Sequence, residues 1–287
     1  MADQNIKGKT VVITGATAGI GLAAACALAK QGARIIGVGR DPARCEAARK
    51  VIEQANPHAV VQFLRADLAL QSAVRQLATA IGKTLTDWEA PGLDLLVNNA
   101  GMIASSLQRT PEGIERTLAV NHLAPFLLTH QLLPWLQAAS QARVITTSSE
   151  SHYRTWINPR RINNPLIYHV LWAYKVSKLE NVLFTLEFNR RVNPTRAYAV
   201  DPGLVNTEIG LKGTGPFSRW IWELRRKGGT PAEVPARTIA YLASAEDLTA
   251  APYWYNGAPK QPSRAARSPK TARELWAVSC QLCGITW

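Results

Sequence analysis

Hydrophobic and polar positions change in regular blocks along the first 200 residues. Short continuous apolar runs, such as Val11–Ile13, are typical of strands that are buried on both faces of a parallel sheet. Longer segments rich in Ala, Leu and charged residues lie between them and predict helices. The strands are predicted at 11–13, 33–39, 59–68, 93–101, 142–149 and 195–203, and the helices at 21–32, 42–55, 72–85 and 114–137 and around Tyr174.

Strict alternation of strand and helix indicates right-handed crossovers between parallel strands. The pattern predicts an α/β fold with a Rossmann-type doubly wound parallel sheet flanked by helices. No linker, repeat or low-complexity stretch interrupts the chain, so a single domain with a C-terminal extension is expected. We divide it into a cofactor-binding and catalytic core at 7–207, a substrate lid at 208–232, and C-terminal helices and tail at 233–287.

Composition narrows the class of protein. The chain of 287 residues is 47% hydrophobic and has no apolar run long enough to span a membrane. The residues before the first strand contain no apolar signal region, so we expect a cytoplasmic protein. Cys280 and Cys283 form a CxxC without further metal ligands nearby, so no metal site is expected.

The positive charge is uneven. Residues 1–150 have 14 Lys and Arg against 11 Asp and Glu, whereas residues 151–287 have 19 against 9. A basic half can meet nucleic acid, an anionic membrane or an acidic ligand. No nucleic-acid motif accompanies the basic residues, so nucleic-acid binding is not expected, and peripheral contact with a membrane stays open.

A glycine-rich turn joins the first strand to the first helix. Thr14, Gly15, Gly19 and Gly21 form a TGxxxGxG pattern in the setting that a dinucleotide site requires. After the second strand, Gly39 stands where NAD sites place an acid, and Arg40 follows. Because arginine binds phosphate with charge-assisted hydrogen bonds, NADP is favoured over NAD. Asp41 leaves NAD open, although its place before Pro42 fits a helix N-cap better.

Five motifs in a fixed order carry a resemblance to a known family. They are the glycine pattern, "NNAG" at 98–101, "VNH" with Asn121, "SS" at 148–149 and "YKVSK" at 174–178. Together they resemble the short-chain dehydrogenase/reductase family, and the long spacing from Ser149 to Tyr174 and the C-terminal tail are most similar to its retinol dehydrogenase branch and to protochlorophyllide reductases. The resemblance implies a catalytic set of Asn121, Ser149, Tyr174 and Lys178. The cofactor contacts that it implies, together with the arginine above, are Gly15, Thr17, Ala18, Gly19, Ile20, Gly21, Arg40, Asp67, Leu68, Asn98, Ala100, Gly101, Tyr174, Lys178, Pro202, Gly203, Val205 and Thr207.

This family transfers a hydride between a nicotinamide and a carbonyl or alcohol. A tyrosine with a pKa of about 10 is a poor acid–base catalyst at neutral pH, and a lysine one turn away favours its phenolate. Tyr174 would thus be the general acid or base, beside Lys178, and Ser149 would stabilise the alkoxide. Asn121 would hold a water chain behind the lysine. Ser148 remains an alternative to Ser149, a buried amide at a helix kink is the alternative role for Asn121, and His122 is interpreted as structural.

Aromatic and basic residues suggest a bulky lipophilic carbonyl or alcohol as substrate. They are concentrated at 153–172 and 216–229, and the candidate contacts are His152, Tyr153, Trp220 and Trp222. A homodimer or homotetramer is compatible with the resemblance. A regulatory protein that binds NADP(H), or a membrane-peripheral protein with little turnover, is the alternative function.

Overall fold

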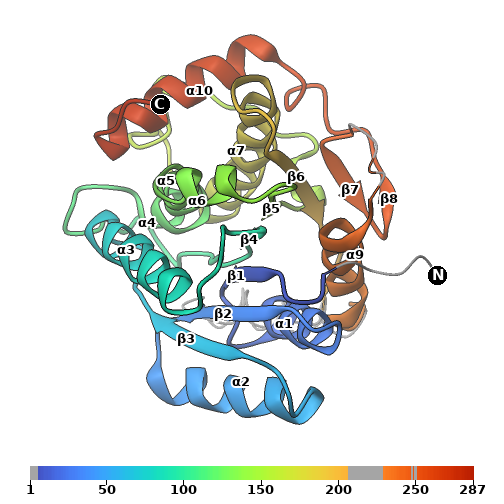
Figure 1. The fold of residues 1–287 in the computed structure, drawn as a ribbon. Coiled ribbons are helices and arrows are strands. Elements are labelled where there is room, and N and C mark those ends of the chain that lie inside the picture. Colours follow the sequence, from blue (N-terminus) through green and yellow to red (C-terminus); the bar gives the residue numbers. More distant parts are fainter. Residues whose placement is uncertain (1–5, 206–228, 247, 249–250) are drawn as a thin grey trace.

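The computed structural model describes residues 6–205, 229–246, 248 and 251–287. Its sheet has eight strands in the order β3-β2-β1-β4-β5-β6-β7-β8, with helices on both faces (Figure 1). The strands are β1 (Thr10–Thr14), β2 (Arg34–Gly39), β3 (Val61–Arg65), β4 (Leu95–Asn98), β5 (Arg143–Thr147), β6 (Arg196–Asp201), β7 (Tyr253–Tyr255) and β8 (Ala258–Pro259). All neighbours pair in parallel except β7 and β8. The predicted doubly wound fold is confirmed, with an antiparallel strand added at one edge.

The strand order reverses beside β1, because β2 and β3 lie on one side of it and β4 to β8 on the other. Such a reversal opens a crevice at the carboxyl ends of the strands, where doubly wound proteins bind their ligands. The glycine-rich turn after β1 lies at this point in the fold.

Alternate residues of the strands enter two separate cores. Val12, Leu96 and Val144 pack on the face that also holds α3, α5, α7 and α10. Val11 and Val97 pack on the opposite face with α1 and α9. The helices are α1 (Gly19–Lys30), α2 (Pro42–Ala55), α3 (Gln71–Asp87), α4 (Arg116–Leu118), α5 (Ala124–Gln131), α6 (Leu133–Ala138), α7 (Val170–Arg191), α9 (Glu233–Ser244) and α10 (Pro269–Cys283). Because both faces are covered, the central strands read as continuous apolar runs.

The segment predicted as one helix at 114–137 is broken into several pieces. A π-helix at Ala119–Leu123 separates α4 from α5, and Leu132 then separates α5 from α6. Short π-helical turns occur frequently at functional sites. Asn121, which the sequence analysis left open as a buried amide at a helix kink, is buried within this π-helix.

The C-terminal residues form more structure than the sequence predicted. β7 adds to the sheet beside β6, and α10 crosses α7 on the outside of the molecule (Figure 1). Trp276 and Trp287 pack with Phe126 of α5 at centroid distances of 5.1 and 4.9 Å. His122 Nε2 lies 2.8 Å from the Ser279 hydroxyl of α10. Residues 251–287 therefore pack with the rest of the domain.

Candidate active site

The glycine-rich turn leaves room for a ligand's phosphates close to the backbone. Gly15 and Gly19 have positive φ angles of 68° and 54°, which glycine adopts without strain. A Cβ added to Gly21 would lie 2.3 Å from the carbonyl oxygen of Gly15, so only glycine fits there. No side chain of the described residues caps the start of α1, at Ala18. Its first N–H groups are therefore available to an anion.

A second segment is fixed to this turn by hydrogen bonds. The Thr14 hydroxyl accepts from the backbone N–H groups of Asn99 and Ala100 at 3.0 and 3.1 Å. The Asn99 side chain donates to the Thr14 carbonyl oxygen at 3.1 Å. In contrast, the Asn98 side chain is buried and donates to Thr129 of α5. The side chain that links "NNAG" to the phosphate turn is thus Asn99, which the sequence analysis did not single out.

The end of β2 shows why no acid stands there. A Cβ on Gly39 would lie 2.4 Å from Thr17 Cγ2 and 2.6 Å from Cys45 Sγ. Arg40 is exposed beside this closed position. Asp41 caps α2 by accepting from the Arg44 N–H at 2.9 Å, as predicted. Of the two charged residues, Asp41 is thereby engaged in the helix, whereas the Arg40 side chain is exposed.

The two serines after β5 have different partners. Ser148 is buried, and its hydroxyl donates to the carbonyl oxygen of Lys178 at 2.8 Å. Ser149 is only partly buried, and its hydroxyl lies close enough to the Tyr174 phenol to lower the pKa of that group. Of the two hydroxyls, the one beside Tyr174 therefore belongs to Ser149, whereas that of Ser148 is bonded to the backbone of α7.

Tyr174 and Lys178 lie one turn apart on α7. The Lys178 ammonium is 5.5 Å from the centre of the Tyr174 ring and donates to the Thr147 carbonyl oxygen at 3.1 Å. Burial lowers the pKa of Lys178 to about 8. Burial raises the pKa of Tyr174 to about 12; hydrogen bonding with Ser149 opposes the rise, and the charge of Asp201 adds to it. Among the protein's own groups, desolvation thus outweighs the expected lowering of the tyrosine pKa.

Asn121 lies in the π-helix, close to α7. Its side-chain amide donates to the Met102 carbonyl oxygen at 2.9 Å and to the Ser177 hydroxyl at 3.0 Å, and it accepts from the Met102 N–H at 2.8 Å. These bonds hold the helix break against α7 next to Lys178. His122 is buried, and burial lowers its pKa to about 4, which fits its interpretation as a neutral structural residue.

An ion pair with a buried carboxylate, which the sequence analysis missed, supports the loop that carries Ser149. Asp201 at the end of β6 accepts from the Glu150 N–H at 2.9 Å and the Gly203 N–H at 3.0 Å. The Lys260 ammonium lies 3.1 Å from the same carboxylate. Asp201 thereby joins the Ser149 loop to the segment that begins at Pro202. Its place in the "YAVDPG" strand end was the only signal in the sequence.

The structure places His152 and Tyr153 in contacts with the C-terminal segment. His152 is fully buried, with Nδ1 2.7 Å from the Ser149 carbonyl oxygen, and Nε2 accepts from the Ser263 N–H at 3.1 Å. The Tyr153 hydroxyl donates to the Gln261 carbonyl oxygen. His152 therefore positions the Ser149 loop and is not available to contact a substrate.

The remaining expected contacts fall in three groups. Asp67 and Leu68 follow β3 at the carboxyl edge, where Asp67 accepts from the Ala69 N–H at 3.1 Å. Pro202, Gly203 and Val205 follow β6 at the same edge. Thr207, Trp220 and Trp222, and most of the segment expected as a lid, lie outside the described residues.

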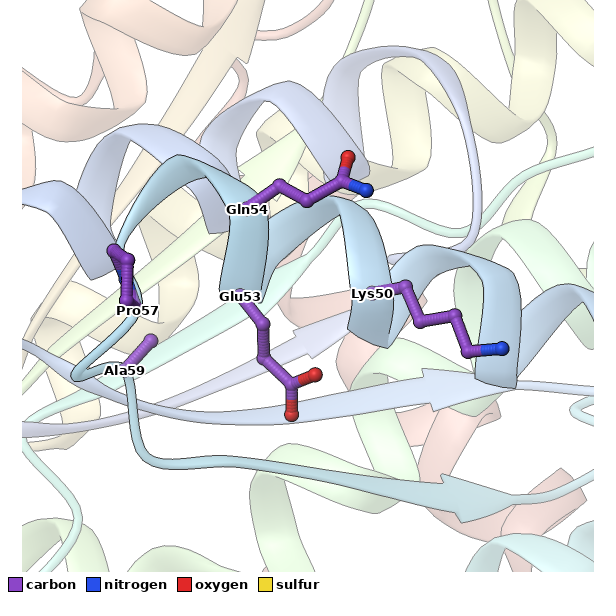
Figure 2. A pocket seen from close by; sticks show the side chains of 5 residues that line it. All are labelled: Lys50, Glu53, Gln54, Pro57 and Ala59. Atoms are coloured by element: carbon purple, nitrogen blue, oxygen red, sulfur yellow. The ribbon is translucent and has the colours of Figure 1, made fainter.

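A shallow depression at the end of α2 is not part of this site. Lys50, Glu53, Gln54, Pro57 and Ala59 line it (Figure 2). Its loop precedes β3, so it lies at the amino ends of the strands, opposite the crevice. Within the described part of the chain, no three His, Cys, Asp or Glu side chains are grouped to hold a metal ion.

Comparison with known proteins places this arrangement in a family. Residues 9–213 match the short chain dehydrogenase model. Human dehydrogenase/reductase SDR family member 13 is 36% identical, covering 98% of this chain and 74% of the relative. Bovine (Bos taurus) retinol dehydrogenase 12 is 35% identical, covering 99% of this chain and 89% of the relative. The crystal structure of an uncharacterized protein from Mycobacterium paratuberculosis superposes with a TM-score of 0.76 at 32% identity, covering 98% and 96% of the two chains.

The chain belongs to the short-chain dehydrogenase/reductase family and to its retinol dehydrogenase-like branch. It is an oxidoreductase that acts on a CH–OH or C=O group of a small molecule and binds a nicotinamide cofactor. Across the residues that the structure describes, none of the helices is both long and apolar enough to cross a membrane.

Proposed function

We propose that the protein is an NADP(H)-dependent oxidoreductase that interconverts a carbonyl and an alcohol of a bulky lipophilic substrate, with Tyr174 as the general acid and base. The observation that carries this proposal is the convergence of Ser149, Tyr174 and Lys178 at the carboxyl edge of the sheet. The phosphate-binding turn after β1 lies at that same edge.

The residues present fit the dinucleotide. The glycine cradle and the uncapped start of α1 would hold the pyrophosphate, and Arg40 would bind the 2′-phosphate of NADP. Asp67 would lie beside the adenine, and Lys178 has N–H donors to offer to the ribose beyond its bond to Thr147. When bound, the nicotinamide supplies the hydride in reduction and accepts it in oxidation.

The chain's own residues then handle the proton. With a pKa of about 12, the Tyr174 phenol is protonated at neutral pH and gives its proton to the oxygen of the reduced carbonyl. The Ser149 hydroxyl donates a hydrogen bond to that oxygen as its negative charge develops. The Lys178 ammonium stabilises the phenolate that remains, since it lies 5.5 Å from the ring centre. Oxidation of an alcohol reverses each transfer.

The decisive experiment replaces the proton donor. Tyr174→Phe should lower kcat by roughly a hundredfold to ten-thousandfold, because general acid–base catalysis contributes that much. NADPH oxidation is measured with a panel of aldehydes, ketones and quinones, and NADPH binding is measured by fluorescence titration. Tyr241→Phe removes the hydroxyl of a partly exposed tyrosine on α9 and is the matched control.

Two results would contradict the proposal. If Tyr174→Phe kept most of the wild-type kcat, Tyr174 would not be the acid. If the wild-type protein bound NADPH tightly but turned over none of the panel, the alternative of a binding protein with little turnover would replace the enzyme.

A further inference from the structure

Large apolar side chains protrude from the segment between Ser149 and Tyr174. Leu166 is 84% exposed and Ile167 86% exposed, and Trp156 and Leu171 are 67% and 43% exposed. Leu166 and Ile167 come directly before α7, and Leu171 lies in its first turn. Trp156 packs edge-on against Trp172 of that turn, with ring centroids 5.8 Å apart. Clustered exposure of this kind marks an interaction site rather than the scattered apolar residues of an ordinary surface.

The segment is fixed on both sides of its most exposed pair. Arg109 donates to the Asn163 carbonyl oxygen at 3.2 Å and to the Asn164 side chain at 2.8 Å. The Glu115 N–H donates to the Asn163 side chain at 2.8 Å. On the other side, the Tyr168 hydroxyl donates to Glu115 at 3.0 Å. These bonds hold the backbone so that Leu166 and Ile167 point outward.

Only positive charge accompanies these apolar residues in the sequence. Between 151 and 179 the chain has no Asp or Glu, while Arg154, Arg160 and Arg161 lie on the same segment. All three arginines are exposed. Apolar side chains with basic neighbours are the composition that binds the interface of an anionic bilayer, where tryptophan is also favoured.

Charge decides between a membrane and a second copy of this chain. A symmetric dimer centred on this segment would bury the three arginines of both protomers in one interface, where residues 151–179 offer no carboxylate to pair with them. An anionic lipid surface instead satisfies the arginines while its acyl region accepts the apolar side chains. We therefore propose that Trp156, Leu166, Ile167 and Leu171, with Arg154, Arg160 and Arg161, form a docking surface for anionic membranes.

The proposed docking surface lies next to Ser149 and Tyr174 along the chain. Its segment starts after Ser149 and ends in the helix turn before Tyr174, so a docked protein holds its site next to the bilayer. A lipophilic substrate dissolved in the membrane would reach the site without crossing bulk water. This last step rests on the proposed function, whereas docking itself is measured without turnover.

The test is co-sedimentation with vesicles of phosphatidylcholine, alone and with added phosphatidylserine. The wild-type protein should bind the anionic vesicles and be released by salt. Leu166→Glu with Ile167→Glu should weaken binding at least about tenfold, because two aliphatic side chains leave the membrane. Arg160→Glu with Arg161→Glu should weaken it about thirtyfold or more, and only on anionic vesicles. Val51→Glu with Val60→Glu, also exposed but on and after α2, should bind as wild type.

Three outcomes would overturn the inference. The proposed docking surface would be wrong if the wild-type protein bound neither kind of vesicle. It would also be wrong if the variant with Leu166→Glu and Ile167→Glu bound as the wild type does. A concentration-dependent dimer in analytical ultracentrifugation that these variants abolish would assign the surface to a second copy. Turnover of a water-soluble aldehyde is measured alongside, so that loss of the active site is distinguished from loss of membrane binding. Turnover missing from the wild type as well would refute the proposed function and leave docking standing.

Discussion

The two sides of the crevice are built by different means. On the side of β1 to β3, the proposed cofactor cradle consists of glycines and backbone N–H groups, which come from residues close together in the sequence. On the side of β5 to β7, the Ser149 loop is held by His152 and Asp201, which bond to Ser263 and Lys260. The first side depends on glycines, which have no side chain to fill the space. The second side depends on buried polar contacts between distant parts of the chain. Substitutions should therefore separate cofactor binding from catalysis.

The substitution expected to separate cofactor binding from catalysis most strongly is at Arg40. Arg40→Ala removes a charge-assisted hydrogen bond to the 2′-phosphate, which is worth about 1.5–3 kcal/mol. The KM for NADPH should thus rise by about tenfold to a hundredfold. The KM for NADH, which lacks this phosphate, should change little. Steady-state kinetics with both cofactors checks this, and an equal rise for both would make Arg40 a structural residue.

A smaller effect on the opposite side is expected at His152. His152→Ala leaves the Ser149 carbonyl oxygen and the Ser263 N–H without their partner. We expect kcat to fall about tenfold, because a buried hydrogen bond left unmade costs about 1–3 kcal/mol. The KM for NADPH should be unchanged. His152→Gln offers one donor and one acceptor and should restore part of kcat; equal kcat in His152→Ala and wild type would show that this support is dispensable.

The smallest effect is the pH dependence set by Lys178. With a pKa of about 8, the group is an ammonium below pH 8 and loses its charge above it. Tyr174 stays protonated throughout this range, so carbonyl reduction should follow the lysine and fall about fourfold from pH 7 to pH 8.5. Lys178→Arg keeps its charge, and its remaining activity should not fall over this range. A wild-type profile that rises toward pH 8.5 would contradict this assignment.

The sequence predicted the cradle side better than the catalytic side. Continuous apolar runs and the TGxxxGxG turn are local signals, so β1 to β6 and the phosphate turn followed directly. β7 and β8 are short strands in a proline-rich stretch, without enough periodicity to predict them. The roles of Asn98 and Asn99 could be assigned only from the structure. The two residues are adjacent and of the same type, but their side chains bond to different partners.

On the catalytic side, spacing brought Tyr174 and Lys178 together, but no pattern linked Asp201 to Lys260, 59 residues away. His152 looked like a substrate contact because it follows Ser149. Its burial against Ser263 arises only when the C-terminal segment packs behind the loop. Whether Lys178 or desolvation has the larger effect on the pKa of Tyr174 likewise depends on burial, which cannot be read from the sequence.

The bond between His152 and Ser263 spans 111 residues and has a consequence for the order of folding. Contacts between distant residues form late, because closing a long loop costs entropy before the contact repays it. On the ribosome, the cofactor cradle has all its parts once β4 and the "NNAG" turn that follows it have emerged. The support behind Ser149 must wait until residue 263 has been made. A nascent chain can thus complete its glycine-rich turn well before Ser149 is held in place.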